Sequence, residues 1–304
     1  MRDQQLLFTR RKKLPYSMTM VNRKFYNRLN FYRKLFQLFS LGFLILIPVL
    51  ITNQIYAIIG NLYSVTIFGI DIVDPAMALQ TTLLTREFIT VLIAGALIPI
   101  IVALLFGKVF CSWMCPFNTF SEYWQIIMRK IFPNRWRLIQ RETSKINPKP
   151  LTYWVILIAF FLLSLIFGFP VITFLSFPGI LSSEISHLIM GMGVGIEILV
   201  VFGVILAEGF LLKRYWCKFI CPVGGLLGIF RTPKTLRLNH NEGNCSCGGA
   251  LEPCGTSCPL GLVPKHEGLY PHCFNCGLCI KTCEKTGFGA LSFGFGKNSK
   301  DKKN

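Results

Sequence analysis

Cysteine carries the clearest chemical signal in this 304-residue chain, because all twelve cysteines follow residue 110 and stand in short spacings. Clustered cysteines in a chain that is not secreted favour metal ligation over disulfide bonds. Two isolated pairs and two groups of four account for all of them. The pairs are Cys111 with Cys115 and Cys217 with Cys221, and the groups are Cys245, Cys247, Cys254 and Cys258, then Cys273, Cys276, Cys279 and Cys283.

The last group has the most specific spacing, Cys273-x2-Cys276-x2-Cys279-x3-Cys283. Three cysteines separated by two residues each bind one [4Fe–4S] cluster, and in two-cluster ferredoxins the fourth ligates the neighbouring cluster. A structural zinc site usually uses two separated pairs, so the spacing favours iron–sulfur ligation over zinc. The motif departs from the ferredoxin pattern at Glu284, where a proline normally follows the fourth cysteine.

The preceding group, Cys245-x-Cys247-x6-Cys254-x3-Cys258-Pro, ends like a ferredoxin motif but opens with an irregular spacing. Nearby glycines supply the loop flexibility that would let these ligands converge. The two groups together predict two [4Fe–4S] clusters. Their predicted ligand sets are Cys245, Cys247 and Cys254 with Cys283, and Cys273, Cys276 and Cys279 with Cys258.

The two isolated pairs share one pattern, an aromatic residue followed by Cys-x3-Cys-Pro, at Phe110–Pro116 and Trp216–Pro222. This spacing places both sulfurs of a pair on one face of a helix. If the pairs pack about a pseudo-twofold axis, Cys111, Cys115, Cys217 and Cys221 would hold a further iron–sulfur cluster or another metal. Alternatively they form a redox dithiol near a quinone, or they are small apolar residues with a structural role.

The elements that must position these cysteines are apolar. Of all residues 52% are hydrophobic and 15% are charged, whereas soluble domains carry about 25% charged residues. Four stretches approach the roughly 20 residues that a membrane-spanning helix needs. A shorter piece, Val171 to Leu181, contains Pro178-Gly179 and is expected to be a surface or re-entrant loop. The four predicted spans are Leu35–Ile59, Phe88–Phe106, Leu151–Phe169 and Gly193–Leu212.

Lys and Arg alternate between the segments that flank these spans. Residues 1–34 hold ten, 60–87 hold one, 107–150 hold eight, 170–192 hold none and 213–304 hold thirteen. Because cytoplasmic loops are rich in Lys and Arg, both termini are expected to be cytoplasmic, in a multi-pass inner-membrane protein. The same rule explains the net charge of +18, so nucleic-acid binding is not expected. No cleaved signal peptide is expected, since the first apolar stretch is too long.

The sequence therefore predicts an all-α membrane protein with four transmembrane helices in two pseudo-repeats, plus a small ferredoxin-like domain. Each pseudo-repeat has two spans and ends in a Cys-x3-Cys-Pro motif. The predicted divisions are a basic cytoplasmic segment (1–34), the transmembrane domain (35–230), a cytoplasmic [4Fe–4S] domain (231–292) and a flexible basic tail (293–304).

A few ionisable residues outside the cysteine motifs are further candidates. Glu197 and Glu208 fall in the fourth predicted span, where a charge is costly, so a role in proton transfer competes with an interfacial position. Glu184 and His187 are expected in the loop before that span and would accept protons from a quinol. The histidines His240, His266 and His272 flank the ferredoxin cysteines, and we expect them to pack or to tune a potential.

Residues 25–290 resemble the NapH-type membrane quinol dehydrogenase subunits of periplasmic nitrate reductase systems. Besides the ferredoxin cysteines, the resemblance rests on Asp74-Pro75, Leu79-Gln80, Phe110-Cys-Ser-Trp-Met-Cys-Pro116 and Trp216-Cys-Lys-Phe-Ile-Cys-Pro-Val-Gly224. It implies electron transfer from menaquinol or ubiquinol towards a periplasmic reductase, most simply nitrate reductase. It also implies partners: a NapG-type periplasmic iron–sulfur protein, the membrane quinone pool and a multihaem cytochrome.

Two other functions compete with that of a quinol dehydrogenase subunit. The first is an accessory or maturation iron–sulfur protein for a periplasmic metalloenzyme such as nitrous oxide reductase. The second, a transporter, is disfavoured because the spans lack paired broken helices and midplane polar residues.

Overall fold

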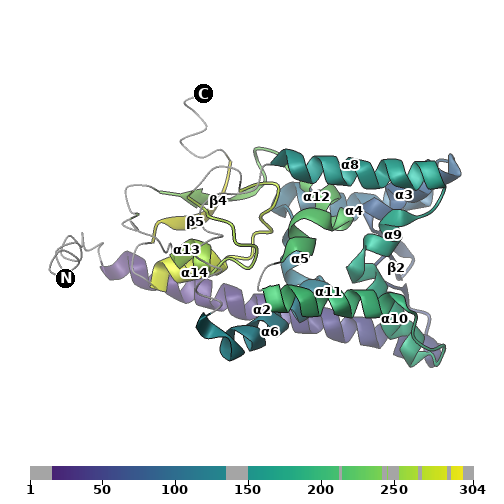
Figure 1. The fold of residues 1–304 in the computed structure, drawn as a ribbon, viewed down its shortest axis with the longest axis horizontal. Helices are drawn as coiled ribbons and strands as arrows, with labels where there is room; N and C mark the ends of the chain where they lie inside the picture. Colours follow the sequence, from purple (N-terminus) through teal and green to yellow (C-terminus); the bar gives the residue numbers. More distant parts are fainter. Residues whose placement is uncertain are drawn as a thin grey trace.

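The computed structural model describes residues 16–134, 150–211, 214–241, 245, 253–265, 269–285 and 289–296. Helices dominate it (Figure 1). The helices are α2 (Tyr16–Thr52), α3 (Pro75–Thr85), α4 (Thr90–Phe106), α5 (Val109–Trp113), α6 (Pro116–Ile131), α8 (Pro150–Phe167), α9 (Val171–Leu175), α10 (Phe177–Ile189), α11 (Glu197–Leu211), the π-helical turn η1 (Trp216–Ile220), α12 (Pro222–Ile229), α13 (Pro253–Thr256) and α14 (Leu278–Lys285). The strands are β1 (Ile58–Gly60), β2 (Ser64–Ile67), β3 (Ile70–Val73), β4 (Leu236–His240) and β5 (Leu291–Phe295).

Each of the four predicted apolar spans is helical, in α2, α4, α8 and α11. They run along the long axis of the molecule (Figure 1). Among the described residues, one helical segment, Arg28–Thr52, is long and apolar enough to cross a membrane. Two further apolar helices, Thr90–Phe106 and Leu151–Phe167, are shorter. Length alone therefore supports the first predicted span and leaves the four-span topology as a proposal.

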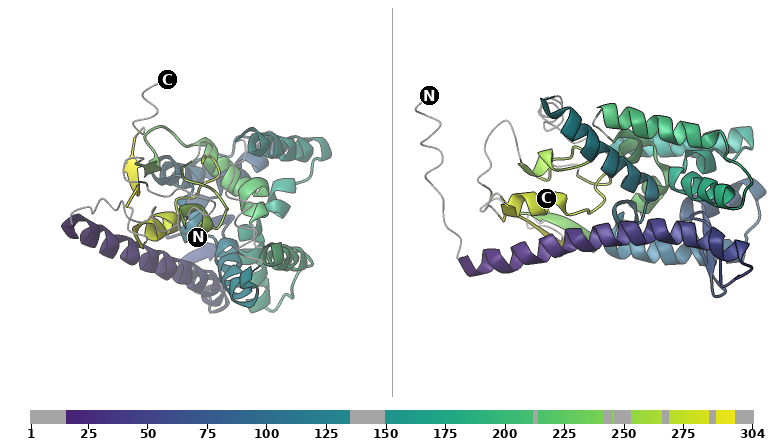
Figure 2. Two further views of the ribbon diagram at one scale, coloured as in Figure 1. Left: turned by 60° about the vertical axis from the view of Figure 1, so that its left-hand side comes forward. Right: turned by 90° about the horizontal axis from the view of Figure 1, so that it is seen from below.

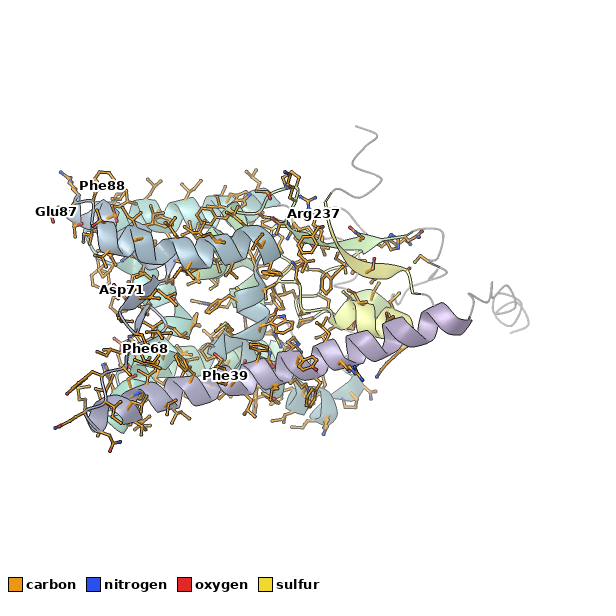
Figure 3. All side chains as sticks on the ribbon, turned by 180° about the vertical axis from the view of Figure 1, so that it is seen from behind. Phe39, Phe68, Asp71, Glu87, Phe88 and Arg237 are labelled. Carbon is orange, nitrogen blue, oxygen red and sulfur yellow. The ribbon has the colours of Figure 1, made fainter. Side chains whose placement is uncertain are left out.

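Large apolar side chains cover the outer surface of these helices (Figure 3). Phe39 on α2 is 65% exposed and Phe88, just before α4, is 84% exposed. An apolar surface of this extent marks a site of contact with a membrane or with another protein. The most exposed examples on α4, α8 and α11 are Val91, Ile101, Leu151, Ile166, Phe167, Leu199 and Val200.

The all-α prediction was wrong for the segment after the first helix. The helix ends at Thr52 instead of continuing to Ile59, and β1, β2 and β3 form an antiparallel sheet, with Ile59 opposite Thr66 and Val65 opposite Ile72. β-branched residues fill these strands, as strands prefer. Phe68 and Gly69 both have positive φ, as a two-residue hairpin turn requires.

The expectation of a loop at Val171–Leu181 was also wrong, because this segment forms α9 and the first part of α10, Phe177–Leu181. Pro178 lies in the first turn of α10, where a proline needs no backbone donor and does not break the helix. Phe177 and Leu181 are buried, and α10 packs against α2, α6 and α11. With 13 residues, α10 is about 20 Å long and too short for a full crossing.

The helices repeat in two halves. The first half contains α2, α3, α4, α5 and α6, and the second contains α8, α10, α11, η1 and α12. In this order, each element of the first half corresponds to one element of the second. Helix α10 packs on α2 and α6, just as α3 packs on α8 and α12. Each half thus inserts its short helix into the other half, and the two halves interlock around the Cys-x3-Cys turns.

The C-terminal part lies at one end of the helical part, where α14 packs against α2 (Figure 2). β4 and β5 form an antiparallel ladder in which Leu238 lies opposite Phe293. The apolar core beneath it includes Leu260, Leu262 and Ile280. We call this core the ferredoxin core, since the C-terminal cysteines pack around it.

Candidate metal centre

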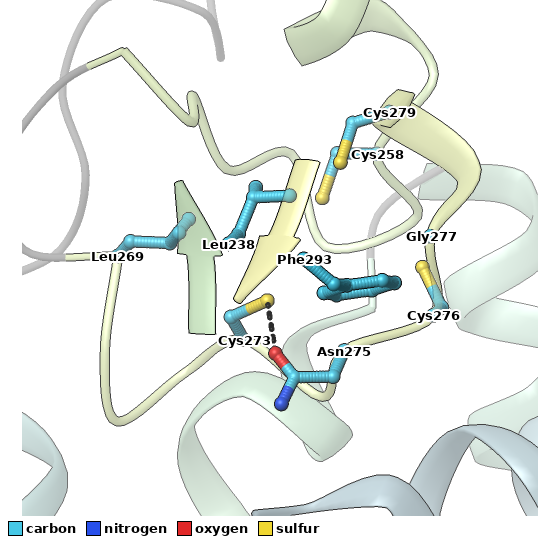
Figure 4. A pocket seen from close by; sticks show the side chains of 9 residues that line it. All are labelled: Leu238, Cys258, Leu269, Cys273, Asn275, Cys276, Gly277, Cys279 and Phe293. Carbon is cyan, nitrogen blue, oxygen red and sulfur yellow. Dashed lines mark hydrogen bonds between the residues drawn. The ribbon is translucent and has the colours of Figure 1, made fainter. Parts of the chain in front are cut away.

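One pocket in the C-terminal part is lined by four thiols, from Cys258, Cys273, Cys276 and Cys279 (Figure 4). These residues are the predicted second ligand set. Cys279 lies on α14, Cys258 follows α13, and the other two lie on the loop before α14. Apolar and small residues complete the lining: Leu238, Leu269, Asn275, Gly277 and Phe293.

The loop that carries Cys273 and Cys276 is shaped by residues with positive φ. Asn275 has φ of 52° and Gly277 has φ of 74°, conformations that asparagine and glycine tolerate best. The Asn275 side chain donates hydrogen bonds to the carbonyl oxygens of Phe106 (2.9 Å) and Leu236 (3.0 Å). The thiol loop is thereby attached to the end of α4.

The donor set of this pocket fits an iron–sulfur cluster better than a single metal ion. Among the described residues, no three His, Cys, Asp or Glu side chains converge on one ion position. Burial raises the pKa of Cys273 to about 11 and that of Cys276 to about 12. Thiols in such a site become thiolates when a positively charged iron centre binds them. Four thiols spread around one apolar pocket are therefore suited to a multi-iron centre.

The first predicted ligand set is described in part. Cys283 is buried in the ferredoxin core, and Cys245 and Cys254 pack against the same core. Cys245 lies within electrostatic reach of Cys283. Cys247 lies outside the described residues, so three of the four predicted ligands are found around one core.

The two Cys-x3-Cys-Pro motifs adopt matching backbone structures. The amide of Cys115 donates to the carbonyl oxygen of Phe110 (3.0 Å), and the amide of Cys221 donates to that of Trp216 (2.9 Å). Each second cysteine is the N-cap of the next helix, whose first residue is the motif's proline. This wide turn followed by a new helix brings both ends of each motif towards the interior.

The four cysteines of these motifs lie together between the halves. Cys115 and Cys217 contact one apolar cluster, while Cys111 and Cys221 contact another. A Cβ placed on Gly224 would lie 3.6 Å from the Cys111 sulfur, across the boundary between halves. Cys111 and Cys217 also pack against the ferredoxin core. The two isolated pairs and the C-terminal cysteines therefore form one continuous sulfur-rich region.

Buried cations surround this region. Lys108 is 4% exposed, and its Nζ donates to the Tyr153 hydroxyl at 3.0 Å. Burial lowers the pKa of Lys108 to about 8, although the nearby Cys111, Cys221 and Cys273 favour its charged form. Lys108 was not among the residues predicted from the cysteine motifs. The signal was present, because a basic residue stands shortly before the first cysteine of each motif.

A buried ion pair lies beside the C-terminal site. Arg33 on α2 is 1% exposed and contacts Glu122 on α6 through both guanidinium nitrogens, at 2.8 and 2.6 Å. Gln37 donates to the same carboxylate at 3.2 Å. Burial alone would raise the pKa of Glu122, but the hydrogen bond and charge of Arg33 lower it below its usual range. The pair joins α2 to α6 within electrostatic reach of Cys276.

Replacing Glu122 with Gln is expected to destabilise the protein by roughly 3–5 kcal/mol at pH 7, because Arg33 would remain buried without a counter-charge. A depressed carboxylate pKa contributes stability above about pH 4.3, and this contribution is lost as the pH falls through the folded-state pKa. Thermal unfolding in detergent at pH 7 and pH 4 measures both effects. The control is the Arg33→Met, Glu122→Leu double variant, which should be close to wild type; equal losses in both variants would contradict this account.

The other ionisable candidates lie in varied positions. Glu184 and His187 lie on α10, so their assignment to a loop was wrong. Glu184 is buried and accepts a hydrogen bond from the amide of Gly195 at 2.7 Å. Glu197 is the first residue of α11. His272 is 1% exposed and its Nδ1 lies 3.0 Å from the Lys218 carbonyl oxygen, His240 ends β4, and His266 lies outside the described residues.

Comparison with known proteins agrees with this arrangement. Residues 88–135 and 194–238 match a family described as "4Fe-4S binding domain", one match in each half of the helical part. The ferredoxin-type protein NapH of Escherichia coli is 26% identical over 84% of this chain and 86% of its own length. The methylamine utilization ferredoxin-type protein MauN of Methylorubrum extorquens is 29% identical over 78% and 77%.

An uncharacterized protein of Methanocaldococcus jannaschii is 28% identical over 67% of this chain and 72% of its own length. No solved structure matches. The predicted resemblance to NapH-type proteins is confirmed by these relatives. The chain thus resembles the NapH-like, ferredoxin-type iron–sulfur proteins, and two of its segments match a 4Fe-4S binding domain.

Proposed function

We propose, from this kinship with the NapH and MauN ferredoxin-type proteins, that the chain is an integral membrane subunit that oxidises quinol. The observation that carries the proposal is the meeting of the four Cys-x3-Cys cysteines between two interlocked halves. They lie among helices with apolar outer surfaces, and two of them, Cys111 and Cys217, pack against the ferredoxin core. Electrons entering from a membrane quinol would therefore have a short path to the C-terminal cysteines.

The ligand sets follow the sequence prediction. Cys258, Cys273, Cys276 and Cys279 would hold one [4Fe–4S] cluster, and Cys245, Cys247, Cys254 and Cys283 a second. The four Cys-x3-Cys cysteines would hold a third centre. A bound cluster supplies one-electron chemistry. Lys108 lies among the thiols of two sets, where its positive charge offsets thiolate charge.

Four membrane spans would account for the apolar surfaces of α2, α4, α8 and α11. The shorter helices would cross with the help of their flanking turns and a locally thinned bilayer. The Lys and Arg distribution then puts both termini, the cysteine motifs and the ferredoxin core in the cytoplasm. The β2–β3 turn at Phe68, which is 80% exposed, would face the periplasm.

The topology predicts the activity of alkaline phosphatase fusions, because this enzyme is active only in the periplasm. A fusion after Lys297 is expected to be inactive, and a fusion at Ile70 is expected to be active. Immunoblots of both fusions control for expression. An active fusion after Lys297 would contradict the proposed topology.

The protein partners and the electron acceptor in this proposal are inferred from the similar proteins. A NapG-type periplasmic iron–sulfur protein, with a multihaem cytochrome beyond it, would take the electrons towards a periplasmic reductase, with nitrate reductase as the leading candidate. The relation to MauN keeps other acceptors within the same scheme. The alternative is an accessory iron–sulfur protein that serves the maturation of a periplasmic metalloenzyme such as nitrous oxide reductase.

Anaerobic reduction by quinol separates the two functions. Protein with reconstituted clusters is mixed with a menaquinol analogue, and the loss of iron–sulfur absorbance is followed by stopped flow. A quinol dehydrogenase subunit is expected to be reduced within seconds, and reduction by dithionite controls for intact clusters. Clusters that dithionite reduces but neither menaquinol nor ubiquinol analogues reduce would favour the accessory role.

A further inference from the structure

Helix α6 has its polar face turned towards the protein and its apolar face turned outward. Asn118, Ser121 and Gln125 are each 1% exposed. Tyr123 is 48% exposed and Ile127 is 47% exposed. Helices on the surface of water-soluble proteins do the opposite. The exposed face of α6 suits a lipid environment, and the space that it covers inside the protein is polar.

Two ionisable side chains meet this polar face from α11 and the turn that follows it. Arg214 is 2% exposed; its Nε donates to the Gln125 side-chain oxygen at 3.0 Å, and its Nη1 donates to the Asn118 side-chain oxygen. Glu208 is 3% exposed and accepts a hydrogen bond from the amide of Trp216 through Oε1 at 2.6 Å. These contacts use one polar atom of each of the Asn118, Gln125 and Glu208 side chains and leave the other polar atom without a hydrogen bond among the described residues.

The polar atoms that lack a hydrogen bond are all buried. Within the described part of the chain, Glu208 Oε2 makes no hydrogen bond of ordinary length and angle, although the Ser121 hydroxyl faces the carboxylate. Four donors in the same region have no acceptor there: Asn118 Nδ2, Trp124 Nε1, Gln125 Nε2 and Trp216 Nε1. Buried polar atoms in folded proteins almost always have partners, either protein groups or ordered water. Five such atoms between α6, α11 and η1 indicate that small polar molecules bind among them.

The size of the space decides which molecule binds. The Trp124 indole lies so close to Gly209 that a Cβ there would collide with it at 1.9 Å. Because α6 and α11 pack this closely, a quinol ring does not fit between them. Water also matches the chemistry, because each molecule both accepts from the indole and amide donors and donates to a carboxylate.

We propose that ordered water between α6, α11 and η1 forms a proton path, in which Glu208 accepts the protons that quinol releases when it is oxidised. The inference rests on the proposed function. Each quinol that becomes quinone loses two electrons, which pass singly to the iron–sulfur centres, and two protons. The Glu208 carboxylate takes one proton, passes it to the water and becomes free for the second. The electron and proton paths would begin close together, since Glu208 lies within electrostatic reach of Cys217.

Several charged and polar groups face this path. Arg214 and Cys217 interact electrostatically with Glu208, and the Ser121 hydroxyl faces it from α6. Glu122 and Arg129 on α6 interact with Arg214 from its other side.

The test compares two buried glutamates. Glu184 is the competing candidate acceptor named from the sequence, and one of its oxygens also accepts a backbone amide, at the opposite end of the helical part. In the Glu208→Gln variant, quinol oxidation with a soluble electron acceptor is expected to fall about 100-fold, as for loss of a general base. Proton release followed with a pH indicator should fall in parallel, and azide, a small weak acid, should restore both. The Glu184→Gln variant tests the competing acceptor: a loss in Glu184→Gln together with wild-type rates in Glu208→Gln would overturn the proposal.

Dithionite-reduced spectra show whether the clusters survive each substitution. A second pair of variants tests the proposal in case Glu208→Gln misfolds. Trp124→Phe removes one buried donor, whereas Tyr123→Phe alters the exposed face of the same helix. Trp124→Phe is expected to slow proton release several-fold, and Tyr123→Phe is expected to leave it unchanged. Wild-type rates in both Glu208→Gln and Trp124→Phe, or a loss in Glu208→Gln that azide does not restore, would overturn the proton path. Failure of the wild-type protein to oxidise quinol would instead refute the proposed function.

Discussion

The Cys111→Ser and Cys217→Ser variants are each expected to lose at least about 100-fold of quinol-dependent electron transfer, and the double variant is expected to lose hardly more. The reason is that both thiols would belong to the proposed third centre. Cys115 lies within electrostatic reach of Cys111, and Cys217 lies within electrostatic reach of Cys115 and Cys221. Removing any ligand would interrupt the same step of electron transfer, so a second removal has little left to affect.

Rates of quinol-driven cluster reduction in anaerobic membranes measure this effect, with immunoblots to show insertion. Met114→Leu is the control within the same motif, because Met114 is 42% exposed and carries no thiol. Its rate should equal that of wild type. Near-normal rates in both single variants, or losses that multiply in the double variant, would show that the two pairs act independently.

The Cys258→Ser and Cys276→Ser variants are expected to lose the same iron–sulfur cluster, about four iron atoms per chain. Cys258 precedes α14 by a long loop, yet it lines one pocket with Cys273, Cys276 and Cys279 (Figure 4). Two residues from separate sequence groups should therefore give one phenotype. The measurement is iron analysis together with the electron paramagnetic resonance spectrum of the reduced protein.

Cys283→Ser provides the comparison for this second experiment. Cys283 belongs to the other predicted ligand set, so this variant should keep the signal that Cys258→Ser loses and lose a different one. The assignment fails if Cys258→Ser and Cys283→Ser lose the same signal while Cys276→Ser loses another.

Local sequence patterns were sufficient for the helices and for the kinds of ligand. The four apolar stretches became α2, α4, α8 and α11 with ends shifted by a few residues, apart from the first: its helix begins at Tyr16, well before the predicted Leu35, and ends early at Thr52. Runs of apolar residues favour helices wherever they are placed, since a helix satisfies its own backbone groups. The same holds for the cysteine spacing, because a cluster imposes its ligand spacing on a short loop.

Contacts between segments that are distant in the sequence decided the rest of the secondary structure. Val171–Leu181 is short and contains proline and glycine, features that suit a surface loop as well as a buried helix. It became helical and buried because the first half of the chain offers α2 and α6 as packing partners. The strands β1–β3 depend in the same way on pairing, which single-strand composition does not specify.

The buried polar groups show this dependence most clearly. The sequence determined that Lys108, Arg214 and Glu208 stand close to the cysteine motifs, but it did not determine what faces them. The tertiary structure alone turned the polar face of α6 inward and brought it against Glu208 and Arg214. The physical reason is that the direction in which an amphipathic helix faces depends on its surroundings: an apolar exterior and a polar interior reverse the usual orientation.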